Sequence, residues 1–310
     1  MCQFIDHGLA RPVSVHNGQS PRWPGALGRS GRLLGLVVTL ISACVSTGDP
    51  VHTTQQKQLS NNQLIAEDVF DNLTALRQAG EQALASGIAA MAATESGRNL
   101  ARYAVICALD PDDSVSVDHD GMVYEFHGRL GLAPGWRQQA LDGDARQRLS
   151  GCILAHVNAF GVEVPISVRL GNNSDTEQGE VPRYKRHEGA FYGDLFAPTP
   201  TVYACIGEPV SDLDVPYGTH DLTLGDRLLR RCTDEALAGS GQTMCGFTFA
   251  GACSDVCDQV SASNYASCWS SPDRTDGVFA EATNVWTLAH DDPNSVWPVL
   301  YQQVYGTTPE

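Results

Sequence analysis

Ten cysteines constrain this chain more than any other feature of its sequence. Six of them fall within the 64 residues from Cys205 to Cys268, among many Gly, Ser, Asp and Thr residues. Structural zinc sites use paired C-x2-C motifs, whereas the closest spacing here is the three residues between Cys253 and Cys257. The cysteines therefore indicate disulfides, which form and persist in oxidising compartments.

A candidate export signal precedes the cysteine-rich part. Arg29 and Arg32 come before an uncharged apolar run over 33–43, which would rise only about 16 Å as a helix. This run is too short to span a bilayer, and a basic flank followed by a short apolar segment is typical of a signal peptide. We therefore expect residues 1–43 to be a signal peptide.

The end of this segment, Ile41-Ser42-Ala43-Cys44, resembles the lipobox of bacterial lipoproteins. The resemblance implies cleavage before Cys44 and attachment of lipid to this cysteine, so that the membrane is a partner. Because Val45 follows instead of an aspartate, it further implies the outer membrane or the cell surface. A signal peptide has only a few residues before its basic flank, so we expect residues 1–25 to be an extension upstream of the true start.

The mature chain then has an even set of cysteines, because Cys2 is lost and Cys44 carries lipid. Residues 44–63 are polar and without periodicity, which predicts a flexible tether. We expect one domain over 64–305, with a cysteine-rich part over 205–270 and up to four disulfides. The eight cysteines available for them are Cys107, Cys152, Cys205, Cys232, Cys245, Cys253, Cys257 and Cys268.

The charge of the mature chain excludes one class of partner. Residues 44–310 carry 16 basic and 35 acidic side chains, a formal charge of −19. Such a domain repels nucleic acid at long range, so we expect no nucleic-acid partner. The overall composition, 42% hydrophobic and 18% charged, is that of a globular protein.

The hydrophobic periodicity predicts an α+β fold with helices in the N-terminal half. Helices are expected over about 60–91, 96–109 and 144–161. An Asp120-Gly121 turn predicts a hairpin, and strict alternation over 162–170 predicts a half-buried strand. Residues 171–200 are expected to be mostly loop. Further strands are expected over 202–206 and 284–289.

Cys152 and His156 are the first candidate site. Their spacing of four places both side chains on one face of a helix, where an imidazole can activate a thiol as a nucleophile. The alternative is a disulfide beside a buried, hydrogen-bonded histidine. We expect this alternative, with Cys107 as the partner, because Cys107 and Cys152 both lie on apolar stripes of neighbouring helices.

An acidic hairpin is the second candidate site. The carboxylates of Asp110, Asp112, Asp118 and Asp120 cluster around a glycine-containing turn, and hard oxygen ligands of this kind suit calcium. The alternative is a solvated turn in which the aspartates bond to the local backbone.

A basic cluster over 183–187 is the third candidate site, which could bind an anionic glycan. The alternative is a solvated loop without a ligand.

Motifs of serine hydrolases, zinc proteases and nucleotide-binding proteins are not found. The sequence therefore favours a lipid-anchored envelope or surface protein with a binding or structural role over an enzyme, and it predicts no cofactor other than calcium. A hydrolase or transferase using Cys152 and His156 and a calcium-dependent binding module are the alternatives.

Overall fold

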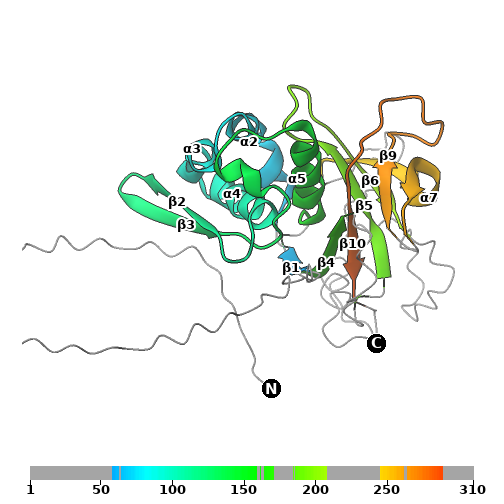
Figure 1. Cartoon of the computed structure of the whole chain (residues 1–310), viewed down its shortest axis with the longest axis horizontal. Coiled ribbons are helices and arrows are strands. Elements are labelled where there is room, and N and C mark those ends of the chain that lie inside the picture. The colour runs from blue at the N-terminus through cyan, green and yellow to red at the C-terminus, as the bar shows by residue number, and fades with distance from the viewer. Residues whose placement is uncertain are drawn as a thin grey trace, which may run out of the picture. The chain divides into compact units, whose positions relative to one another are not determined.

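The structure, a computed structural model, describes residues 58–62, 64–158, 161, 164–170, 184, 186–207, 245–261 and 264–288. These residues form an α+β fold with helices in the N-terminal half, which confirms the predicted fold class (Figure 1). The signal segment, Cys44, Cys232 and most of the expected tether lie outside the described residues. Among the described residues, no helix combines the length and hydropathy needed to cross a membrane.

The central sheet has the strand order β1-β4-β10-β5-β6-β7. Its first four pairings are antiparallel, whereas the β6–β7 pairing is parallel. The strands are β1 (Gln58–Asn62), β4 (Val164–Leu170), β5 (Arg186–Asp194), β6 (Thr201–Ile206), β7 (Thr248–Ala252) and β10 (Ala282–Thr287).

Two of these strands lie where the sequence predicted irregular chain. β1 occupies the end of the stretch 44–63, which was expected to be a tether, and pairs with β4. β5 lies within 171–200 and pairs with both β10 and β6. Neither strand alternates clearly between apolar and polar residues: β1 has a single apolar residue, and β5 contains Gly189 and Gly193.

The helices cover one face of the sheet (Figure 1). The expected hairpin is present as strands β2 and β3, with Asp120 and Gly121 at φ 53° and 76° in the turn. The elements of this layer are α1 (Ala66–Phe70), α2 (Leu73–Gly80), α3 (Leu84–Ile88), η1 (Met91–Ala93), α4 (Glu95–Ala108), β2 (Ser114–His119), β3 (Met122–His127), η2 (Pro134–Arg137) and α5 (Gly143–Ala155).

The single helix predicted over 60–91 is wrong, because this stretch forms β1 and three short helices. α2 ends at Gly80, where a Cβ atom would stand 2.6 Å from the Phe196 ring. The indole N–H of Trp136 donates to the carbonyl oxygens of Ala79 and Gln82, at 3.2 and 3.1 Å. Tertiary contacts thus satisfy the carbonyl groups that a helix leaves free at its end.

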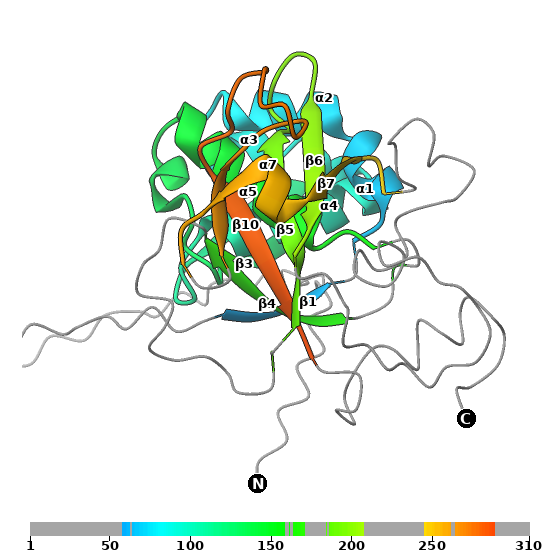
Figure 2. The same ribbon diagram turned by 90° about the vertical axis from the view of Figure 1, so that its right-hand side faces the viewer.

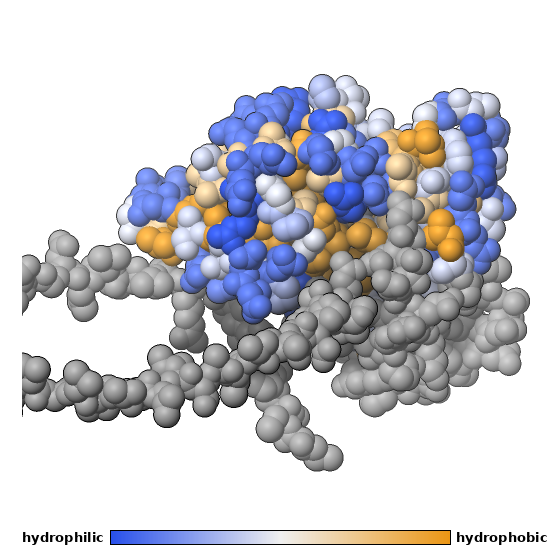
Figure 3. All heavy atoms as spheres, in the orientation of Figure 1, coloured by the Kyte–Doolittle hydropathy of each residue, from blue (hydrophilic) through white to orange (hydrophobic). Residues whose placement is uncertain are grey.

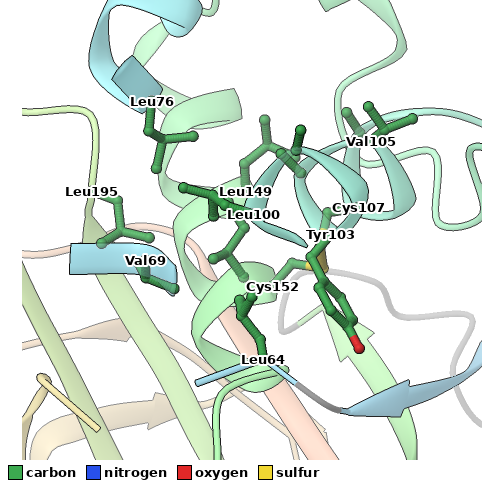
Figure 4. Packing of buried hydrophobic residues seen from close by; sticks show 14 of the residues in the cluster. Leu64, Val69, Leu76, Leu100, Tyr103, Val105, Cys107, Leu149, Cys152 and Leu195 are labelled. Atoms are coloured by element: carbon green, nitrogen blue, oxygen red, sulfur yellow. A yellow bond between two sulfur atoms is a disulfide. The ribbon is translucent and has the colours of Figure 1, made fainter. Parts of the chain in front are cut away.

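α4 and α5 match the predicted helices closely and form the centre of the core. α5 is shorter than expected, since it ends at Ala155 rather than Gly161. The side chain of Thr94 accepts from Gly97 N at the start of α4, and that of Asp142 accepts from Ala145 N at the start of α5. A disulfide joins Cys107 to Cys152 between the two helices, as their apolar stripes predict, among the buried side chains that Figure 4 shows.

The other face of the sheet is covered by α7 (Cys253–Val256) and by the hairpin of β8 (Cys257–Gln259) and β9 (Tyr265–Cys268), as Figure 2 shows from this side. The middle of β4, residues 166–169, is buried on both faces, so the prediction of a half-buried strand is wrong. Ile166 belongs to the core beneath the helices, while Ser167 and Arg169 are buried on the opposite face.

Candidate functional site

Cys152 and His156, the first predicted pair, form a structural unit. The Cys152 sulfur is bonded to Cys107, and both side chains are fully buried. His156 Nδ1 lies 2.8 Å from the carbonyl oxygen of Cys152, and its ring packs 5.0 Å from that of Tyr103. Because a nucleophilic cysteine must be a thiolate with access to substrate, this oxidised sulfur does not serve as one.

Cys107, Cys152 and His156 also form the one group of three potential metal ligands that the described residues bring within 4.8 Å of one another. The sulfurs bond to each other, and a metal takes thiolates as ligands. His156 Nδ1 is directed to a backbone carbonyl oxygen, which requires a proton on this nitrogen. The group is therefore a disulfide with an adjacent histidine rather than a metal centre.

The acidic hairpin does not gather its carboxylates. The Asp118 side chain accepts a hydrogen bond from Gly121 N at 3.3 Å, which is the local turn interaction expected of aspartate. Asp120 lies 3.5 Å from His119, while Asp110 and Asp112 are exposed on the preceding turn. In Figure 3, polar side chains cover much of this layer of the molecule. Of the described carboxylates, none joins a group of three metal ligands, so the geometry gives the calcium site no support.

The basic cluster 183–187 is not a solvated loop over its described residues. Arg183 and Lys185 lie outside them, β5 begins at Arg186, and Tyr184 and His187 are buried. Of these residues, only His187 contributes its side chain to a buried cluster on the face of the sheet opposite the helices.

A buried polar and aromatic cluster lies on the face of the sheet opposite the helices. The guanidinium of Arg169 in β4 stands 4.0 Å over the ring of Trp286 in β10. The imidazole of His187 in β5 lies 5.0 Å from the Trp286 ring and stacks at 5.5 Å on Tyr265 in β9. We call this arrangement the His187 cluster, and its members are Arg169, His187, Asn264, Tyr265, Asn284 and Trp286.

Two asparagines hold the β8–β9 hairpin against this cluster. The Asn284 side chain accepts from Tyr265 N and donates to Tyr265 O, both at 2.9 Å. The indole N–H of Trp286 donates to Asn264 Oδ1 at 3.3 Å. Asn284 therefore acts as a backbone partner for β9 and fixes where Tyr265 stacks.

His187 is the chemically distinctive member of the cluster. Its side chain is 2% exposed, and neither imidazole nitrogen makes a hydrogen bond of normal geometry within the described part of the chain. Burial lowers the pKa of His187 to about 3, and the positive charge of Arg169 acts in the same direction. The nearby Asn284 side chain and the Gly189 backbone, as polar groups beside the ring, oppose both effects. The ring is thus neutral and offers one hydrogen-bond donor and one acceptor.

Gly207 provides the space for this ring. A Cβ atom at position 207 would stand 2.3 Å from His187 Nδ1 and 2.5 Å from the His187 carbonyl oxygen. A side chain at this position would therefore displace the imidazole, so the backbone of residue 207 forms one wall around His187.

Sequence reasoning missed the His187 cluster as a site. The strand prediction assigned Arg169 to the solvent side of β4, because it alternates with Val168 and Leu170. Trp286 lay within the predicted strand 284–289, but nothing local shows that it neighbours β4. The available signal was the unusual content of strand 284–289, where Asn284 and Trp286 share one face.

No protein-family model matches the chain, and no significant similarity to a curated protein or to a solved structure is found.

Proposed function

We propose that this chain is an exported, lipid-anchored protein of the bacterial outer membrane or cell surface, with a structural or binding role. The observation that carries the proposal is the state of its cysteines. All seven cysteines for which the structure describes a side chain are disulfide-bonded, namely Cys107, Cys152, Cys205, Cys245, Cys253, Cys257 and Cys268. Disulfides in such number persist in oxidising compartments and are rare in the bacterial cytosol.

The positions of the disulfides support a stabilising role. Cys107–Cys152 joins two helices, Cys205–Cys253 joins β6 to α7, and Cys257–Cys268 joins β8 to β9. Each bond thus crosses between elements instead of standing free at an exposed surface. A hydrolase that uses Cys152 and His156 has no support in this arrangement.

For the binding role we assign the His187 cluster. It combines a neutral imidazole whose nitrogens make no hydrogen bond of normal geometry in the described chain, an aromatic wall and a buried guanidinium. Small-molecule sites commonly have an apolar or aromatic lining with a few polar groups directed at the ligand, and the His187 cluster has this composition. In the described state Tyr265 covers His187, so binding requires that the hairpin carrying Tyr265 moves.

The anchor is tested by metabolic labelling with an alkyne fatty acid in a bacterium that expresses the full chain. The wild type is expected to be labelled and to fractionate with membranes, because buried acyl chains contribute about 0.8 kcal/mol for each CH₂. Cys44→Ser is expected to abolish the label. Cys2→Ser is the matched control, since it removes a cysteine that the cleaved leader would carry, and it should leave labelling unchanged. Full labelling of Cys44→Ser would rule the anchor out.

A further inference from the structure

Two disulfides lie in contact beneath the β8–β9 hairpin. Cys205 is bonded to Cys253, and Cys257 is bonded to Cys268. The sulfur of Cys205 is 3.7 Å from that of Cys257, a van der Waals contact between the two bonds. All four side chains are at most 2% exposed and belong to the small core on this face of the sheet.

These bonds hold short elements, which hydrogen bonds from Asn284 and from the backbone of Phe279 also tie to their surroundings. α7 has four residues, β8 has three and β9 has four. We call the described residues of this segment, 253–261 and 264–268, the cap. Cys205–Cys253 fixes its first residue to β6, and Cys257–Cys268 joins residues that face each other across the β8–β9 ladder. Both bonds restrict the unfolded chain, so reduction of either one loosens the attachment of the cap.

The cap also covers the His187 cluster. β9 contributes Tyr265, which stacks on His187, and the residue before β9 is Asn264, which accepts from the Trp286 indole. Release of β9 would therefore withdraw both Tyr265 and Asn264 from the cluster. The cap thus contributes both to the sulfur contact, through Cys257, and to the cover of the cluster, through Asn264 and Tyr265.

We propose that the two disulfides form one redox latch, in which reduction of Cys257–Cys268 is passed to Cys205–Cys253 and frees β9 from the His187 cluster. The inference depends on the oxidised state that the proposed function requires, but not on the lipid anchor. A protein or small-molecule dithiol of the envelope supplies two electrons and two protons and becomes a disulfide itself. Cys257 and Cys268 are left as thiols.

The second step needs no further reductant. The Cys257 thiolate attacks the sulfur of Cys205, a Cys205–Cys257 bond forms, and the Cys205–Cys253 bond breaks. Cys253 leaves as a thiolate and takes up the proton that Cys257 lost. The product retains one disulfide between β6 and β8, while Cys268 in β9 no longer takes part in a disulfide.

The test is disulfide mapping of the full-length protein after limited reduction. The protein is treated with substoichiometric dithiothreitol, quenched with N-ethylmaleimide and digested. The expected singly reduced species carries maleimide on Cys253 and Cys268 and a Cys205–Cys257 bond. In the same samples, diethyl pyrocarbonate is expected to modify His187 at least tenfold faster than in the oxidised protein. Singly reduced species that retain Cys205–Cys253, or a His187 that stays protected once both bonds are reduced, would overturn the proposal.

A matched pair of variants tests the exchange without any reductant. Cys268→Ser leaves Cys257 as a thiol beside Cys205–Cys253, and a Cys205–Cys257 bond is expected in a measurable fraction of the molecules. Cys257→Ser leaves Cys268 as the thiol, and only Cys205–Cys253 is expected, because it is Cys257 that touches Cys205. Identical maps from the two variants would contradict the latch. These results are independent of Cys44 labelling, so failure of the latch and failure of the anchor are distinguishable.

Discussion

Gly151 of α5 lies directly against Thr283 of β10. A Cβ atom at position 151 would stand 2.7 Å from Thr283 Oγ1 and 2.6 Å from the carbonyl oxygen of Phe191 in β5. The absence of a side chain at this one position lets the central helix of the core approach the sheet closely. This contact therefore sets the distance between the two layers.

Gly151→Ala is expected to destabilise the domain by about 1–3 kcal/mol, because overpacking at a close contact with backbone atoms forces the helix away from the sheet. Chemical denaturation of the purified protein measures the loss. Gly143→Ala is the matched control in the same helix. Since nothing lies within 4 Å of the Cβ position of residue 143, this change should be neutral or slightly stabilising. Equal effects of the two substitutions would contradict the close approach.

Several parts of the fold could be predicted from the sequence because their determinants are local. The caps and apolar stripes of α4 and α5 and the Asp120-Gly121 turn are each specified within a few residues. The Cys107–Cys152 bond followed from two such stripes that face a common core.

The rest depends on contacts that the local sequence does not contain. The 60–91 helix is interrupted partly because Trp136, far along the chain, supplies hydrogen bonds at the end of α2. Arg169 was assigned to solvent because Trp286, whose ring lies against its guanidinium, comes more than a hundred residues later. The His187 cluster likewise joins β4, β5, β9 and β10, so periodicity within any one strand could not reveal it.

The Cys107–Cys152 bond is expected to contribute about 4 kcal/mol, the chain-entropy value for a sequence separation of 45. The variant in which both cysteines are replaced by alanine should lose that amount, a large part of a typical total of about 5–15 kcal/mol. Denaturation midpoints of the oxidised wild type and the double variant measure it. Coincident unfolding curves would show that this bond does not hold α4 and α5 together.

Acid is expected to destabilise the domain through His187. The pKa of this group is lowered from 6.5 in the unfolded chain to about 3 in the fold. Its contribution is therefore fully present above pH 6.5 and is lost progressively as the pH falls towards 3. Between these two values only the unfolded chain binds the proton, which costs the fold about 1.4 kcal/mol for each pH unit. At pH 5 the expected loss is thus about 2 kcal/mol relative to the free energy of unfolding at about pH 7.5.

His187→Gln separates this effect from general acid denaturation. Its unfolding free energy should fall less between about pH 7.5 and pH 5 than that of the wild type, by the same ~2 kcal/mol. His127→Gln, at an exposed position of β3, is the matched control for the loss of one imidazole. A wild-type slope in His187→Gln would show that His187 is not the buried group that titrates.

The most direct test of the account is the intact mass of the full-length protein after expression in a Gram-negative bacterium and detergent extraction of its membranes. The sample is alkylated under denaturing conditions, with and without prior reduction. The predicted species begins at an acylated Cys44, carries no alkyl group before reduction and gains eight after it. A protein that retains residues 1–43, or one that carries alkyl groups without prior reduction, would contradict an exported, lipid-anchored and oxidised domain.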